Sequence, residues 1–174
     1  MLPQNLRQTD TLFRDDDCWG RYLEKVGPYA KSIDRDFLSQ ICLEHFDRFD
    51  DYFPGFNIDR HRVCREKLTT RAIYDSVRYD KGERLDFWYF QMDDYLAGIS
   101  KLQYPQLEHC AENGTWSFPP VLIEKTFGES LGPYELGGPL HLIEGTHRVS
   151  FINRLYELGK IGAEKEHEVL VVRP

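Results

Sequence analysis

The stretch from Leu140 to Gly159 constrains the fold more than any other part of this 174-residue chain. It begins with a mostly apolar run, residues 140–143, which is typical of a buried strand. Apolar residues then recur at helical spacing, at Val149, Ile152, Leu155 and Leu158, and Gly159 is a typical helix stop. Only residues 144–148 separate the two patterns. The sequence therefore predicts a strand that turns directly into a helix.

Residues 144–148 have the chemistry of an anion site. The first N–H groups of a helix lack intrahelical partners and carry the positive end of the helix dipole. Gly145 allows close backbone approach, Thr146 can bind a phosphate oxygen, and Arg148 presents a planar fork of donors. His147 can move a proton, and Glu144 can bind Mg²⁺ or act as a base. We expect Glu144 and His147 to be catalytic, and Gly145, Thr146, His147 and Arg148 to bind phosphate.

A purely structural role for the same turn stays open, in which Arg148 pairs with Glu144 and the helix simply begins there. His141, Glu144 and His147 have the spacing H-x2-E-x2-H, which superficially suggests metal ligands. On a strand and a turn these side chains would not share one face, so we expect no metal held by protein ligands. The sequence also has no Walker A loop and no H-E-x-x-H motif.

The first two-thirds of the chain is predicted to be mainly helical. We expect helices over residues 32–53, 59–77 and 83–104, and one short turn of helix within 106–112. After residue 115 we expect strands at 121–123, 140–143 and 168–172, with a glycine- and proline-rich loop over 128–139. The predicted class is α+β, with a helical region (1–114) packed on a small α/β module (115–174). The two could together form one compact domain.

Two clusters in the helical region invite a functional interpretation. A basic run within residues 60–71 could cover an anionic ligand, or it could be a solvated helix face paired with acids. The adjacent aromatic residues 87–90 cannot all face one core, so at least one is expected to face a cleft or a partner.

Composition narrows the function classes. The formal net charge of −7 and the pI near 5.4 oppose general binding to a nucleic-acid backbone. The four cysteines form no C-x-x-C pair, and we expect all four to be reduced and structural. No apolar segment of signal-peptide or membrane-span type occurs, so we expect a cytoplasmic protein without a membrane partner.

Several motifs occur in a recognisable order over the last third of the chain. Pro119-Pro120 precede the apolar run 121–123, residues 142–148 read Leu-Ile-Glu-Gly-Thr-His-Arg, the next helix ends in Leu158-Gly159, and an apolar strand follows at 169–172. Residues from about 118 to 172 resemble the ParB/sulfiredoxin-like fold, the ParBc domain. In that family the G-x-H-R turn holds nucleotide phosphates, with Mg²⁺ bound to the nucleotide. The resemblance therefore implies a phosphate-binding role for Gly145, Thr146, His147 and Arg148.

Departures from the family pattern limit what is implied. Sulfiredoxins place a nucleophilic cysteine directly before His-Arg, and Thr146 stands there, so sulfinic-acid repair by that mechanism is not expected. Chromosome-partitioning relatives carry a helix-turn-helix domain after this module, whereas this chain ends at Pro174. Because of this departure and of the net negative charge, we do not expect the protein to bind DNA.

The leading hypothesis is a nucleotide- or phosphate-binding protein of the ParB/sulfiredoxin-like type, acting on a small phosphorylated ligand as a phosphotransferase or nucleotide hydrolase. The expected cofactor is a nucleotide, ATP or CTP, with Mg²⁺. The alternative is a non-enzymatic acidic inhibitor, an immunity protein or antitoxin, that binds a basic protein toxin through steered association.

Overall fold

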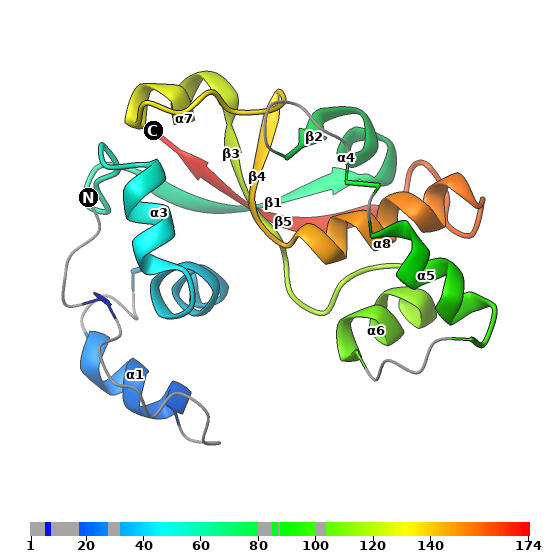
Figure 1. Cartoon of the computed structure of the whole chain (residues 1–174). Coiled ribbons are helices and arrows are strands. Elements are labelled where there is room, and N and C mark those ends of the chain that lie inside the picture. Colours follow the sequence, from blue (N-terminus) through cyan, green and yellow to red (C-terminus); the bar gives the residue numbers. More distant parts are fainter. Residues whose placement is uncertain (1–5, 8–17, 28–31, 80–84, 87, 100–103) are drawn as a thin grey trace.

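A five-stranded mixed sheet organises the chain (Figure 1). The computed structural model describes residues 6–7, 18–27, 32–79, 85–86, 88–99 and 104–174. The strands are β1 (Arg62–Thr69), β2 (Val77–Arg78), β3 (Val121–Glu124), β4 (Leu140–Glu144) and β5 (Glu166–Arg173). The helices are α1 (Cys18–Val26), α2 (Arg35–Phe37), the π-helical η3 (Leu38–Leu43), α3 (Phe46–Tyr52), α4 (Thr70–Ser76), α5 (Tyr89–Leu96), α6 (Pro105–Asn113), α7 (Lys125–Leu131) and α8 (Thr146–Glu157). The predicted α+β class is confirmed.

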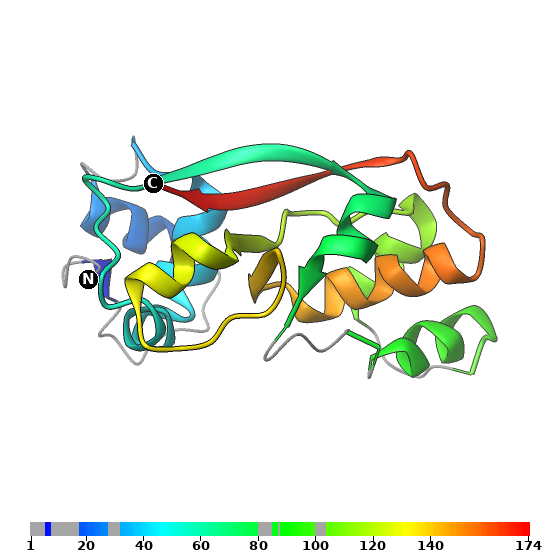
Figure 2. The ribbon, with the colours of Figure 1, turned by 90° about the horizontal axis from the view of Figure 1, so that it is seen from above.

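The strand order in the sheet is β1-β5-β3-β4-β2. Strand β5 pairs antiparallel with β1 and parallel with β3, while β4 pairs antiparallel with β3 and parallel with β2. Figure 2 shows β1 and β5 running side by side as a long pair of strands. Strands from both sides of residue 114 thus belong to one sheet.

Hydrophobic cores cover both faces of the sheet, because successive side chains of a strand point to opposite faces. Leu170 and Val172 of β5 pack with the N-terminal helices α1, η3 and α3. Val169 and Val171 pack on the other face, with α4, α5, α6 and α8. Burial on both faces explains why residues 169–172 of β5 form an unbroken apolar run.

The later predicted elements are confirmed, namely the strands β3, β4 and β5 and the helix α8. Three other predictions are wrong in part. Residues 125–131 form a helix, α7, and its residues 128–131 lie in the expected loop over 128–139. The side chain of Glu124 caps this helix by accepting from the backbone N–H groups of Thr126 and Phe127. In the described part of the expected helix over 83–104, the helix runs only from Tyr89 to Leu96; residues 83–84, 87 and 100–103 of that expectation lie outside the described residues.

The predicted helix over residues 59–77 is also wrong in its first half, which forms β1. Long-range pairing with β5 stabilises the strand: Glu66 accepts two hydrogen bonds from Arg173, and Lys67 forms an ion pair with Glu166. Only the second half is helical, and it begins where Thr69 caps α4 by accepting from the N–H of Ala72. Cross-strand partners decided the conformation here, and they lie about a hundred residues away in the sequence.

No helix in the described ranges combines the length and the apolar character that crossing a membrane requires.

His167 of β5 is a buried polar residue that contacts the start of α4 and the segment between α6 and β3. Its side chain is 1% exposed, and its ring nitrogens lie 2.8 Å from the hydroxyl of Thr70 and 3.0 Å from that of Thr115. Burial, aided by the nearby charge of Lys165, lowers the pKa of His167 to about 4. The folded protein therefore holds this imidazole neutral.

Acid should weaken the fold through His167. Because the unfolded imidazole binds its proton near pH 6.5 and the folded one only near pH 4, this contribution is complete above pH 6.5 and is lost as the pH falls toward 4. We expect the free energy of unfolding to drop by about 2 kcal/mol between pH 7.5 and pH 5 from this group. Urea unfolding of the wild type and of His167→Gln at both pH values measures this change in the free energy of unfolding. Equal pH dependence in the two proteins would contradict the assignment.

Candidate functional site

The predicted turn joins β4 to α8 without an intervening loop. Gly145 has a φ of +109°, a conformation that favours glycine, and α8 begins at the next residue. A Cβ atom at Gly145 would lie 2.6 Å from the Cβ of Pro120 and 3.0 Å from a guanidinium nitrogen of Arg148. Among the described residues, no side chain caps this helix N-terminus. Gly145 is therefore required both by its backbone conformation and by close packing.

A pocket of about 160 Å³ opens at this turn. All five predicted site residues, 144–148, line it. The opposite wall comes from parts of the chain that the sequence did not associate with the turn, namely Gln40, Glu44, Tyr104, Gln106 and Phe118. The structure thus brings the predicted residues together and adds a wall from η3 and the residue that follows it, from the start of α6, and from the segment before β3.

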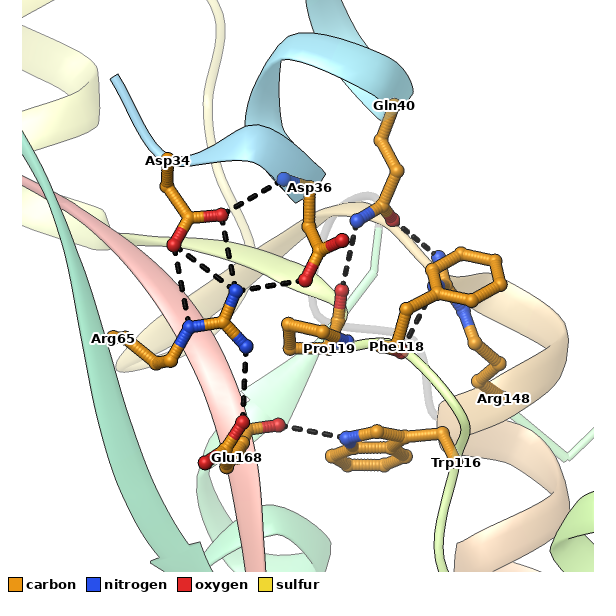
Figure 3. Close-up of polar contacts among 9 residues, drawn as sticks. All are labelled: Asp34, Asp36, Gln40, Arg65, Trp116, Phe118, Pro119, Arg148 and Glu168. Carbon is orange, nitrogen blue, oxygen red and sulfur yellow. Dashed lines mark hydrogen bonds and ion pairs between the residues drawn. The ribbon is translucent and has the colours of Figure 1, made fainter. Parts of the chain in front are cut away.

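Figure 3 shows Arg148, a cation of this pocket, beside Gln40 and Phe118. Its side chain is buried, with 5% of its surface exposed. Its guanidinium donates to the side-chain oxygen of Gln40 at 2.6 Å and to the backbone oxygen of Phe118 at 3.1 Å. It also lies 4.1 Å from the centre of the Phe118 ring and 3.6 Å from a carboxylate oxygen of Glu144. The pairing with Glu144 that the structural interpretation required is present, and the same guanidinium lines the pocket.

Glu144 has a histidine partner, but it is not the predicted one. Its carboxylate lies 3.2 Å from Nε2 of His45, at the start of α3. This hydrogen bond is the main reason that the pKa of His45 is raised. Burial alone would raise the pKa of Glu144, but the contact with His45 and the charge of Arg148 outweigh it and lower that pKa. His45 and Glu144 therefore form an acid–base pair that favours the protonated imidazole and the ionised carboxylate, and sequence reasoning missed it.

His147 occupies an aromatic environment. Its ring centre lies 4.1 Å from that of Trp88 and 5.6 Å from that of Tyr104. Burial lowers the pKa of His147, so the neutral ring predominates at neutral pH. His147 can donate one hydrogen bond into the pocket, but its imidazole is not the one that Glu144 contacts.

Glu44 brings a second carboxylate to the pocket. Its pKa is raised mainly by burial, with a further contribution from the negative charge of Glu144. Two carboxylates beside an expected phosphate fit Mg²⁺, which proteins usually hold through one or two carboxylates together with substrate phosphates. Glu44 and Glu144 are the residues that would contact it. Among the described residues, no group of three or more His, Cys, Asp or Glu side chains is arranged to hold a metal ion by itself.

The basic run does not face this pocket. Arg65 donates to Asp34, Asp36 and Glu168, and its guanidinium lies on the other side of the Phe118–Pro119 segment from Arg148 (Figure 3). Lys67 pairs with Glu166 of β5, and Arg71 lies 4.0 Å from Glu164. These three cations neutralise nearby acids, which agrees with the alternative that the run is paired with carboxylates.

Comparisons of the chain with protein-family models, with curated proteins and with solved structures found no match.

Substitution of Gly145 should be far more costly than substitution of a second glycine with positive φ. We expect Gly145→Ala to lower the free energy of unfolding by about 3 kcal/mol, since it adds a clash with Pro120 to the backbone strain. Gly159 ends α8 with a φ of +66°, and a Cβ atom added there would meet no described atom within 4 Å. Gly159→Ala should therefore cost only about 1 kcal/mol. Chemical denaturation of both variants tests this, and equal losses would contradict it.

Proposed function

We propose that this protein binds a phosphate-bearing ligand, a nucleotide with Mg²⁺, in the pocket at the N-terminus of α8. The observation that carries the proposal is the convergence of a helix N-terminus without a side-chain cap, the buried guanidinium of Arg148 and two carboxylates on one pocket. The α8 N-terminus and Arg148 attract phosphate oxygens. Glu44 and Glu144 would repel them unless a divalent cation intervenes.

The resemblance to ParB/sulfiredoxin-like proteins points to the same ligand class. Its motif residues 144–148 all line the pocket, and β4, α8 and β5 follow one another in the order that the resemblance implies. Bound Mg²⁺ would neutralise phosphate charge. Gly145 allows the positive φ with which the chain enters α8, Thr146 offers a hydroxyl at the first helical position, and Arg148 is held in place by Gln40 and Phe118.

Phosphoryl transfer or nucleotide hydrolysis is the catalytic form of this proposal. Such reactions depend mainly on placing the phosphate and stabilising its charge. His45 does not line this pocket, but its contact with Glu144 helps to keep the Glu144 carboxylate charged and in place on the pocket wall. His147, with its lowered pKa, supplies a neutral donor on the pocket wall.

The test is calorimetric titration of ATP, CTP and GTP, each with Mg²⁺, into the folded protein. Arg148→Lys keeps the charge but removes the planar fork, and we expect it to weaken binding about tenfold. Glu44→Gln should weaken nucleotide binding in the presence of Mg²⁺, because it removes a metal ligand. It should strengthen nucleotide binding in the absence of Mg²⁺, because it removes a charge that repels the phosphates. Glu164→Gln, on a side chain that is 83% exposed, is the matched control for charge.

Thermal unfolding of each variant checks that it is folded before binding is compared. The proposal would be wrong if none of the three nucleotides bound at millimolar concentration. It would also be wrong if Arg148→Lys bound them as tightly as the Glu164→Gln control.

The acidic inhibitor is the second candidate function, supported by the net charge of −7 and by apolar side chains exposed on and after α5. Phe90, Leu96 and Ile99 are 54%, 41% and 67% exposed. If a basic protein binds there, Phe90→Ser should abolish that binding and Arg148→Lys should leave it unchanged. Nucleotide binding should show the opposite pattern, with a loss in Arg148→Lys and no change in Phe90→Ser.

A further inference from the structure

A second pocket adjoins the phosphate pocket along the same helical segment and the same strand. Gln40 and Glu44 face the first pocket, whereas Ile41, His45 and Arg48 face the second. On β4, Glu144 lines the first pocket and residues 141–143 line the second. The contact between His45 and Glu144 stands where the two pockets meet.

Aromatic rings dominate the wall of this second pocket. Tyr52 and Tyr134 meet edge to face with ring centres 4.5 Å apart, and they are 36% and 45% exposed. Phe49 and Phe53 pack together behind them at 5.1 Å. Tyr79 lies parallel to the imidazole of His141, with an interplanar angle of 10°. Such a wall favours flat, unsaturated groups through stacking and edge-to-face contact.

A few polar groups converge on the same space. Arg48 donates to the hydroxyl of Tyr79 at 3.0 Å, and its guanidinium lies 5.7 Å from the centre of the Tyr52 ring. Glu135 and His45 complete the polar part of the lining. An apolar pocket with a small number of convergent polar groups is the usual form of a site for an organic ligand. The side chains of Arg48, Glu135 and His45 can form hydrogen bonds with the donors and acceptors at the edge of a heterocyclic ring.

The size of the pocket limits what can enter it. Its volume is about 80 Å³. Because one water molecule needs roughly 10–15 Å³ of such space, the pocket has room for about five to eight non-hydrogen atoms. That is the size of one substituted ring, and a complete nucleotide is too large for it.

We propose that this second pocket takes the planar ring of the ligand whose phosphates lie at the N-terminus of α8, so that the ligand spans both pockets past His45. The inference rests on the proposed function for the phosphate half of the ligand and adds the ring-binding half. It assigns to Tyr52, Tyr134 and Arg48 the recognition of the ring.

The experiment separates the two halves of the ligand. Mg²⁺–tripolyphosphate carries the phosphates without a ring, adenosine and cytidine carry a ring without phosphates, and ATP and CTP carry both. Each is titrated calorimetrically into the wild type, Tyr52→Ala and Tyr134→Ala. Both tyrosines are partly exposed, so these variants should fold. Tyr156→Ala is the matched control, because Tyr156 packs edge to face against Tyr74, outside both pockets.

We expect CTP, whose base is a single substituted ring, to bind tenfold or more tightly than tripolyphosphate, and ATP, whose base has two fused rings, to show a smaller advantage. Tyr52→Ala and Tyr134→Ala should each reduce that advantage fivefold or more while leaving tripolyphosphate affinity unchanged. The control should match the wild type. Saturation-transfer NMR should place the ring protons of the bound nucleotide closest to the protein.

The possible failures are distinguishable. If tripolyphosphate and every nucleotide bind equally and the tyrosine variants change nothing, the ring pocket is overturned and the phosphate site stands. If a nucleoside binds through Tyr52 and Tyr134 while no phosphate compound binds better, the proposed function is overturned and the ring pocket stands. If nothing binds, both are overturned.

Discussion

The buried guanidinium of Arg148 holds together three parts of the chain that lie far apart in the sequence. It contacts Gln40 of η3, the backbone of Phe118 before β3, and Glu144 at the end of β4. A buried cation without such partners would be very costly, so each contact is needed once Arg148 is inside. Gln40 in turn donates to the backbone oxygen of Pro119, which fixes the same segment from a second direction (Figure 3). The pocket at α8 exists because these three parts meet around one side chain.

The structural role of Arg148 is therefore compatible with the phosphate recognition that we propose for it. The two interpretations that the sequence left open, a pairing with Glu144 and a phosphate-binding role, do not exclude each other. A guanidinium has five N–H donors, and those used by Gln40 and Phe118 hold its plane in one orientation. Such prior orientation lowers the entropy that a ligand must overcome on binding.

The contact between His45 and Glu144 has a similar double role. It joins the start of α3 to the end of β4, and it separates an aromatic pocket from a polar one. The charges of this pair and of Arg148 stand beside the carboxylate of Glu44. A ligand that spans both pockets would meet a ring-binding wall at one end and a helix N-terminus at the other. The acid–base pair would lie between them.

Sequence patterns were sufficient where local propensity and burial agree. The run from β4 through Gly145 into α8 was predicted, because a glycine between an apolar strand pattern and an apolar pattern of helical spacing has few alternatives. The same reasoning failed for β1. Its mixed charges and scattered apolar residues resemble a helix locally, but Glu66 and Lys67 find their partners on β5. Glu44 and His45 carried no local signal, since their role appears only when α3 meets β4.

By itself, the sequence determined the α+β class, the turn of residues 144–148 and the chemical groups that this turn carries. These depend on neighbours within one turn of chain, and local patterns record them. Only the tertiary structure decided that Glu144 would pair with His45, that Arg148 would be buried against Gln40, and that an aromatic pocket would adjoin the site. Those outcomes depend on which distant segments share the sheet and its two cores, and long-range packing sets that choice.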